Sequence, residues 1–423
     1  MGKARAASFS CAVLLAAAVG VAAQQAPRGL PGEPVAQQRL GPGVVYRQFR
    51  ARTPQGEPWS IHVLEVNRRE RSVEIRAAAG QNRDGEMQRD LPSALGRAEL
   101  ARGSIVLGVV NGDYDLAAPY LGVPDGLSVT STILWTTGKP DWPAMAILRA
   151  GEPVIAVPEV RVEMRAGPQR WAIGAVNKPL GSAHGGEPRL YSREFRGSVK
   201  SASPFRAAVL TRVSPPLPLR VNRAVRARVQ EVFAETTEAT IPRDGLVVVQ
   251  RLSAEPAGRT AGPAPLTVLR PGQAVRIELE VRVGGSKNIR EAIGGFPILL
   301  RDGKPNIVGT PSEYLARRHP RTATCYSRER VVFAVVDGRQ PQLSVGMTLG
   351  ELAELMASLG CQVAMNTDGG GSSVMAVAAP GEDAVTGVEA ELPPPLRIVN
   401  SPSDGRERGR GNAWLIVARR KGS

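Results

Sequence analysis

A segment near the C-terminus places one carboxylate, three glycines and two hydroxyls in succession, Asn366-Thr367-Asp368-Gly369-Gly370-Gly371-Ser372-Ser373. Three consecutive glycines lose more conformational entropy on folding than a plain turn requires, which indicates a close backbone approach or a bound ligand. Their amides could form a nest for an anionic oxygen, while a carboxylate beside them could stabilise positive charge at a sugar carbon. An ordinary loop between two strands is the alternative. We predict that Asp368 is catalytic and that substrate is bound by Asn366, Gly369, Gly370, Gly371 and Ser372.

A second polar segment, Arg318-His319-Pro320-Arg321-Thr322, precedes a predicted strand. Arg321 carries a planar, permanently charged guanidinium that suits bidentate binding of phosphate or carboxylate, and Thr322 adds a hydroxyl. His319 could move a proton near neutral pH, although a lone histidine is more often structural. The chain has three histidines, and they form no metal-like cluster: His62, His184 and His319. We therefore predict neither a metal nor a cofactor.

A second candidate carboxylate follows a predicted buried strand, in Asn111-Gly112-Asp113-Tyr114. Glycoside cleavage usually needs two carboxyl groups, so Asp113 is predicted to be a catalytic partner of Asp368 and Asn111 a substrate ligand. A turn stabilised by the Asp113 side chain is nearly as compatible with the pattern. Arg406 lies in a polar loop before the last predicted strand and is a further candidate ligand, with a solvated salt-bridged turn as the alternative.

The elements that must position these residues are mostly strands. Period-two alternation, as in 59–66 and 71–76, predicts half-buried strands, and 322–326 with 331–336 predict a hairpin. A capping box at Thr348-Leu349-Gly350-Glu351 starts a helix with apolar residues at helical spacing, and Gly360 is a fitting stop. A weaker helix is predicted over 91–101. The predicted class is α+β, with strand-rich mixed sheets and a few helices.

The N-terminal residues have the pattern of a secretory signal peptide: Lys3 and Arg5, then an apolar run, then small residues before Gln24. We expect a signal peptide over 1–23, a flexible leader over 24–43, a β-rich region over 44–104 and the main domain over 105–420. The protein is then secreted or periplasmic. In such an oxidising compartment Cys325 and Cys361 could form a disulfide or remain small buried hydrophobes.

The formal charge of +15 comes mostly from arginine. It is compatible with loose association with envelope polyanions, and an arginine-rich background composition explains it equally simply. The basic residues are scattered and no nucleic-acid motif is present, so no nucleic-acid partner is predicted. The expected partner is a sugar-phosphate or glycan substrate.

An ordered set of motifs resembles the phosphodiester glycosidase family, to which the domain of the lysosomal uncovering enzyme belongs. The segment from Asp337 to Met375 is highly specific as an ordered set. The matching stretches, in family order, are 110–114, 291–295, 300–303, 318–323, 336–339, 346–353, 359–361, 366–375, 399–400 and 406–412.

The resemblance implies a phosphodiester glycosidase-like fold and cleavage of a sugar-phosphate bond on its glycosyl side, in a cleft built from separate loops. Asp368 and its neighbours match the family's Asp-Gly-Gly-Gly-Ser region, and Arg321 and Thr322 match its Arg-Thr pair. We expect a secreted hydrolase of a sugar-1-phosphodiester, with Asp113, Glu313 or His319 as proton partner. The alternatives are a non-catalytic envelope protein that binds anionic glycan and an ordinary glycosidase without phosphate.

Overall fold

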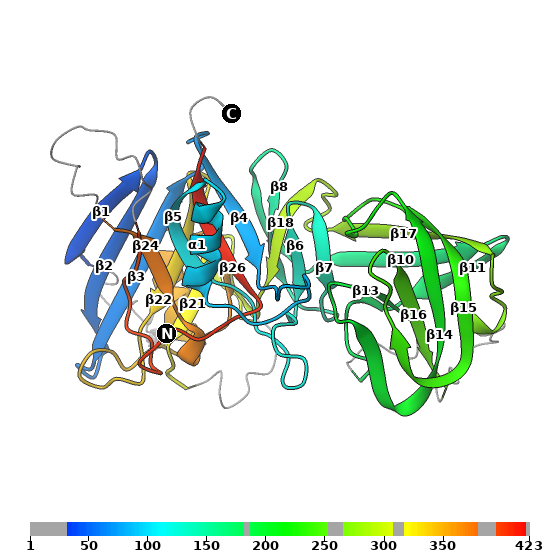
Figure 1. Cartoon of the computed structure of the whole chain (residues 1–423). Coiled ribbons are helices and arrows are strands. Elements are labelled where there is room, and N and C mark those ends of the chain that lie inside the picture. Colours follow the sequence, from blue (N-terminus) through cyan, green and yellow to red (C-terminus); the bar gives the residue numbers. More distant parts are fainter. Residues whose placement is uncertain (1–31, 182–186, 253–264, 308–316, 380–394, 420–423) are drawn as a thin grey trace, which may run out of the picture.

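The computed structural model describes residues 32–181, 187–252, 265–307, 317–379 and 395–419, and these form four sheets with two α-helices (Figure 1). Nearly all strand pairs are antiparallel. Sheet A contains, in spatial order, β1 (Ala36–Gly41), β2 (Val44–Arg52), β3 (Pro58–Asn67), β22 (Arg330–Val336), β21 (Arg321–Tyr326), β23 (Val363–Asn366), β19 (Ile298–Arg301) and β20 (Lys304–Pro305).

Two five-stranded sheets accompany sheet A. Sheet B contains β25 (Leu396–Ile398), β24 (Met375–Ala378), β5 (Ile105–Asn111), β26 (Asn412–Ala418) and β4 (Val73–Ala79). Sheet C contains β7 (Ile133–Thr137), β6 (Leu127–Thr130), β18 (Ile289–Gly294), β8 (Ala144–Leu148) and β9 (Pro153–Ala156).

Sheets A, B and C enclose one apolar core, to which each contributes large side chains such as Phe333, Trp414 and Ile293. Helix α3 (Leu349–Ser358) covers the other face of sheet A, and α1 (Pro92–Ala101) covers the other face of sheet B. Strands with both faces covered have continuous apolar sequences, and six consecutive residues of β22 are accordingly buried.

Sheet D forms a lobe that packs on sheet C, at the right of Figure 1. The 3₁₀ segment η1 (Pro265–Thr267) also lies in this lobe. The eight strands of sheet D are, in spatial order, β11 (Gln169–Ile173), β10 (Glu159–Ala166), β17 (Ala274–Arg282), β15 (Val225–Thr240), β14 (Ser198–Ser214), β16 (Leu246–Arg251), β13 (Arg189–Ser192) and β12 (Ala175–Val176).

The structure confirms the predicted α+β class and several of its elements. The α3 capping box is present, because the Thr348 hydroxyl accepts a bond from the Glu351 amide and the Glu351 carboxylate accepts one from the Thr348 amide. Strands β21 and β22 form the predicted hairpin. Cys325 and Cys361, which the sequence left open, form a disulfide with 5.9 Å between their Cα atoms.

The predicted domain boundaries differ from the sheets that form. Residues 36–41 of the expected leader form β1, which pairs with β2, while the expected signal peptide lies outside the described residues. Strands β3 and β4 pair with β22 and β26, so the region 44–104 belongs to the same sheets as the C-terminal part. Alternation predicts a strand but not its distant partner. Within the described ranges, no helix is long and apolar enough to cross a bilayer.

Candidate active site

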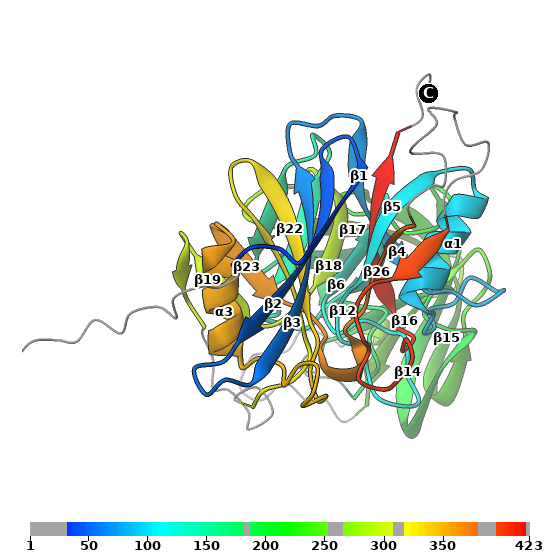
Figure 2. The same ribbon diagram turned by 90° about the vertical axis from the view of Figure 1, so that its left-hand side faces the viewer.

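The predicted site residues meet at one end of the core of sheets A, B and C. Asn111 and Asn366 are the last residues of β5 and β23, whereas Thr322 and Asn412 lie at the starts of β21 and β26. Because these strands are antiparallel, the end of one lies beside the start of the next. Figure 2 shows β26 beside β5 and running toward the C-terminus.

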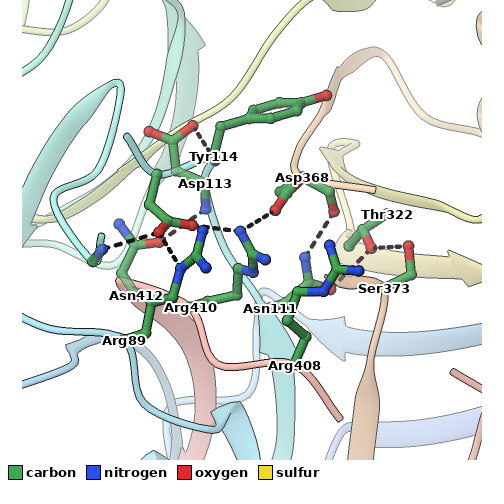
Figure 3. Close-up of polar contacts among 12 residues, drawn as sticks. Arg89, Asn111, Asp113, Tyr114, Thr322, Asp368, Ser373, Arg408, Arg410 and Asn412 are labelled. Carbon is green, nitrogen blue, oxygen red and sulfur yellow. Dashed lines mark hydrogen bonds and ion pairs between the residues drawn. The ribbon is translucent and has the colours of Figure 1, made fainter. Parts of the chain in front are cut away.

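The loop that carries Asp368 is fixed by buried side chains of both sheets (Figure 3). The Asn111 amide group donates to the Asp368 carbonyl oxygen at 2.8 Å, and its Oδ1 accepts from the Val374 amide at 3.0 Å. Asn111 Oδ1 also accepts from the Thr322 hydroxyl at 2.9 Å, and this hydroxyl lies 3.2 Å from Ser373 Oγ. Asn111 and Thr322, predicted to bind substrate, therefore position the loop instead.

Asp368 is nearly buried, with 10% of its side chain exposed, and its Oδ2 lies 2.8 Å from Arg410 Nη1. Burial raises its pKa to about 6, although Arg410 and a hydrogen bond from Ser372 favour the ionised form. Ser372 thus contacts the predicted catalytic carboxylate. A carboxylate with this pKa changes its charge close to neutral pH, as proton transfer requires.

Arg410 joins Asp368 to a second carboxylate, that of Asp115, which is fully buried. Asp115 also receives bonds from Arg89 Nε at 2.5 Å and from the Gly122 amide at 2.9 Å. Among the described residues, Arg410 Nε is buried and has no hydrogen-bond partner. Arg410, Asp115 and Arg89 were not among the site residues predicted from the sequence.

Arg406, the predicted ligand in the loop before β26, is exposed. The arginines of this loop that reach the Asp368 segment are Arg410 and Arg408. Arg408 forms an ion pair with Asp404 across Gly371, and its Nε lies 2.9 Å from Asp404 Oδ2. The alternating Arg-x-Arg-x-Arg spacing of 406–410 was the available signal, but it does not tell which guanidinium turns inward.

Gly369 and Gly371 allow neighbouring atoms to approach the backbone closely, and Gly370 allows a left-handed backbone conformation. A Cβ on Gly369 would lie 2.7 Å from the Pro320 carbonyl oxygen, and one on Gly371 would lie 2.4 Å from Asp404 and Arg408. Gly370 has φ 64°, a left-handed conformation that favours glycine. The amides of Gly370, Ser372 and Ser373 donate to backbone carbonyls of Pro320, Gly369 and Gly370. Of the three glycine amides predicted to form an anion nest, the Gly370 amide is therefore already bonded within the backbone.

The predicted roles of Arg321 and His319 are not supported by their positions. Arg321 is fully buried, and its guanidinium donates to the carbonyls of Met347 and Arg317, each at 2.8 Å. It anchors the start of β21 and is not presented to a phosphate. The His319 ring contacts Arg339, with 3.3 Å between Nδ1 and Nη2. Glu313, the other suggested proton partner, lies outside the described residues.

The carboxylate of Asp113, the predicted catalytic partner of Asp368, is held by three neighbouring donors. Its carboxylate accepts bonds from the Tyr114 amide at 2.8 Å, the Gly126 amide at 2.5 Å and the Trp142 indole at 3.2 Å. Figure 3 shows it directed away from Asp368. Burial raises its pKa to about 7, against the effect of the Gly126 amide. Asp113 orders a loop beside the site.

That loop brings three half-buried aromatic rings together. The rings of Trp142 and Phe296 stack with centroids 4.9 Å apart, and Tyr114 meets Trp142 edge-on at 5.8 Å. Asn366 joins this group to the site: its Nδ2 donates to the Tyr114 hydroxyl at 2.9 Å and to the Phe296 carbonyl at 2.7 Å. Asn366 Oδ1 is buried and has no partner within the described ranges.

A buried network supports the other side of the Asp368 loop. Asn400 donates to the Asp337 carboxylate and to the Ser373 carbonyl, each at 3.1 Å, and its Oδ1 accepts from the Met375 amide. Asp337 also contacts His62 Nε2 at 3.0 Å, and both side chains are 1% exposed. Asp337 is thus part of this buried network, and His62 is its partner. No group of three or more potential metal ligands occurs in the described part of the chain.

The fold and site define a strand-rich α+β protein with a nearly buried carboxylate-arginine site between two sheets. The sequence model of the family described as phosphodiester glycosidase matches residues 220–417. This match confirms the resemblance to that family predicted from the motif order, and it supports a glycosidase-type phosphodiester hydrolase fold. Asn111, Asp115 and Arg89 precede the matched range, and the contacts above add them to the site.

Solved structures show the same fold. The chain is similar to a hypothetical protein from Synechocystis, with TM-score 0.68 and 18% identity over 92% of this chain and 64% of that one. It therefore spans less than two thirds of the Synechocystis chain. A Burkholderia pseudomallei protein described as exported has TM-score 0.61 and 20% identity, over 85% of this chain and 74% of that one.

A weaker similarity is to the catalytic domain of zebrafish N-acetylglucosamine-1-phosphodiester α-N-acetylglucosaminidase, auto-inhibited by its pro-peptide. It has TM-score 0.42 and 13% identity over 92% of this chain and 87% of that one. A comparison with curated proteins gives no match.

Proposed function

We propose that the protein is an exported hydrolase that cleaves the glycosyl side of a sugar-1-phosphodiester, with Asp368 as its catalytic carboxylate. One observation carries the proposal. Asp368 is slightly exposed and has a raised pKa, and its ion-pair partner Arg410 and its neighbour Asn366 each have a buried polar atom without a partner among the described residues. Buried polar groups are nearly always paired, so such atoms point to a ligand.

The proposed reaction breaks the bond between the sugar C1 and the phosphate oxygen. The bonding electrons leave with that oxygen and give a phosphomonoester, and a water oxygen bonds to C1. The ionised Asp368 stabilises positive charge at C1 and accepts the proton of this water, as carboxylates do in glycoside cleavage. The proton then passes to solvent. A phosphate leaving group is already weakly basic, so it needs a cation more than a proton donor.

Arg408 is the proposed phosphate ligand in place of Arg321. Its side chain is 43% exposed, its ion-pair partner Asp404 is also accessible, and its charge lowers the pKa of Asp368. An exposed guanidinium can exchange a carboxylate for a phosphate with little loss of hydration. Arg410 instead holds Asp368 against Asp115.

The aromatic group formed by Tyr114, Trp142 and Phe296 is the proposed sugar contact. Aromatic rings offer apolar faces to the C–H groups of a sugar, and Asn366 Oδ1 offers an acceptor to a hydroxyl or an N–H beside them. This assigns the phosphate and the sugar to different sides of Asp368.

The test is hydrolysis by the purified full chain of a panel of sugar-1-phosphodiesters, with neutral aryl glycosides beside them. We expect phosphodiesters to be cleaved and Asp368→Asn to reduce kcat/KM at least about 1,000-fold. Asp244→Asn, an exposed aspartate between β15 and β16, is the matched control and should keep full activity. Cleavage of aryl glycosides alone would indicate an ordinary glycosidase. Undiminished phosphodiester cleavage by Asp368→Asn would refute the assignment of the carboxylate.

Export is proposed from the secretory pattern of residues 1–23. Expression of the full chain in a bacterial host followed by fractionation should yield a processed protein in the periplasm or medium. Retention of the unprocessed chain in the cytoplasm would contradict this part of the proposal.

A further inference from the structure

A second hollow, at the opposite end of the strands that carry the site, is lined mainly by arginines. It has a volume of about 510 Å³ and lies among the β3–β4, β8–β9 and β21–β22 turns and the end of β26. Seven arginines and three glutamates line it. We propose that this hollow binds a linear polyanionic glycan with repeating phosphate groups. The inference does not depend on the proposed hydrolase activity.

The hollow is separate from the candidate active site. Arg410 precedes β26 and Arg419 follows it, so one strand separates the two sites. Seven residues at about 3.3 Å each span roughly 20 Å. Strand β22 also runs from the hollow to the candidate active site. Arg328, which lines the hollow, precedes this strand, and Asp337, which lies beside the Asp368 loop, follows it. In Figure 2 β26 ends at the top of the view, near the C-terminus.

Part of this positive charge is uncompensated within the protein. Arg419 and Arg290 form ion pairs with Glu74, and Arg68 donates to the Ser327 carbonyl. The remaining four arginines are exposed, and no ion pair or side-chain hydrogen bond is found for them within the described ranges: Arg69, Arg71, Arg149 and Arg328. Like charges gathered in one hollow repel each other and favour a bound anion.

Two adjoining hollows extend this one in both directions. One shares Asn67 and Arg69 with it and adds Arg330, Glu65 and Glu329, and the other shares Glu74 and Arg419 with it and adds Arg76 and Arg102. The added arginines are ion-paired with glutamates, so the unpaired positive charge lies in the central hollow. The three form a continuous strip around the strand ends. A strip of this kind fits a chain with regularly spaced charges better than a single phosphate ion.

The residues that line the hollows also favour a glycan over other polyanions. None of the residues that line these three hollows is aromatic. Proteins that hold single-stranded nucleic acid generally stack its bases on aromatic rings. A hollow on sheet D, lined by Arg161, Glu163, Glu278 and Glu280 among others, contains acids and bases in nearly equal number and provides a natural contrast.

The test measures binding of the full chain to poly(ribosyl-ribitol phosphate), a linear glycan with repeating phosphates, with neutral dextran and a single-stranded oligonucleotide of equal charge as comparison probes. The triple variant Arg71→Ala, Arg149→Ala, Arg328→Ala should weaken the Kd for the phosphate glycan at least about tenfold, the loss of roughly one charge-assisted contact. Its salt dependence should also become shallower. Hydrolysis of a small sugar-1-phosphodiester should remain unchanged in this variant, so the two proposals fail separately.

The matched control removes three exposed arginines of the sheet D lobe, Arg170→Ala, Arg223→Ala and Arg243→Ala, with the same change in net charge. It should keep the wild-type Kd. Equal weakening by both triple variants would show that net charge alone attracts the chain and would overturn the site. Tighter binding of the oligonucleotide, or equal binding of dextran, would overturn the phosphate-glycan assignment.

Discussion

Replacing Asp368 by asparagine should abolish activity and at the same time stabilise the folded protein at neutral pH. Asparagine keeps the shape of the neutral acid but cannot ionise. In the folded protein burial raises the pKa of Asp368 from 3.8 to about 6, so ionisation is less favourable there than in the unfolded chain. The variant removes that unfavourable ionisation.

The sign of the effect follows from proton binding. Below pH 3.8 both states hold the proton, and the wild type has the full benefit of the neutral acid. Between pH 3.8 and about 6 the unfolded chain releases the proton while the folded protein keeps it, so wild-type stability falls as pH rises. Above about pH 6 the loss of wild-type stability no longer changes with pH. A rise of the pKa from 3.8 to about 6 corresponds to about 3 kcal/mol.

The assay is urea denaturation of wild type and Asp368→Asn from pH 4 to pH 8. We expect similar stabilities at pH 4 and a gain for the variant that reaches up to about 3 kcal/mol by pH 8. Glu351→Gln is the control of opposite sign, because Arg318 and the helix cap lower the pKa of Glu351 against the effect of burial. That variant should be less stable than wild type by a constant amount above about pH 4.5, and the difference should shrink as the pH falls below this value. An Asp368→Asn curve parallel to wild type over this range would refute the argument from burial.

The remaining predictions concern the sugar side, the glycines and the disulfide. Trp142→Ala should raise KM about tenfold with little change in kcat, measured by steady-state kinetics, since it removes a binding ring. Gly369→Ala should lower stability by about 1–3 kcal/mol in thermal denaturation, because its Cβ would meet a backbone carbonyl. Gly371→Ala should leave stability nearly unchanged and raise KM, because its Cβ would displace the ends of exposed side chains. Replacing Cys325 and Cys361 by alanine should lower the free energy of unfolding by about 4 kcal/mol, given their separation of 36 residues; unchanged denaturation curves would contradict this.

Local patterns were sufficient to predict much of the fold. The capping box and apolar spacing of α3, and the hairpin of β21 and β22, depend on residues close in sequence. The strands that pair with β1, β3 and β4 could not be predicted from the sequence, because alternation specifies which face of a strand is buried and not which strand lies beside it. The lobe of sheet D has no signal of its own for the same reason.

The candidate site was predicted in its position but not in the roles of its residues. Asp368 and the convergence of separate loops follow from the motif order, whereas Arg321 was chosen for the chemistry of its side chain. A guanidinium can satisfy its donors with backbone carbonyls as well as with phosphate, and Arg321 does so. Which arginine turns toward Asp368 is decided by the start of β26, where Arg410 precedes the buried Asn412.

The arrangement around Asp368 is one that stability alone does not explain. Asn366 Oδ1 and Arg410 Nε lack partners in the described part of the chain, and each such buried atom destabilises the folded state by about 1–3 kcal/mol. The raised pKa of Asp368 adds to this at neutral pH. Asn111 and Thr322, by contrast, use their side chains fully to hold the same loop. Two of the buried atoms that lack a partner in the described part of the chain thus lie beside Asp368, where the proposed sugar phosphate would supply the missing partners.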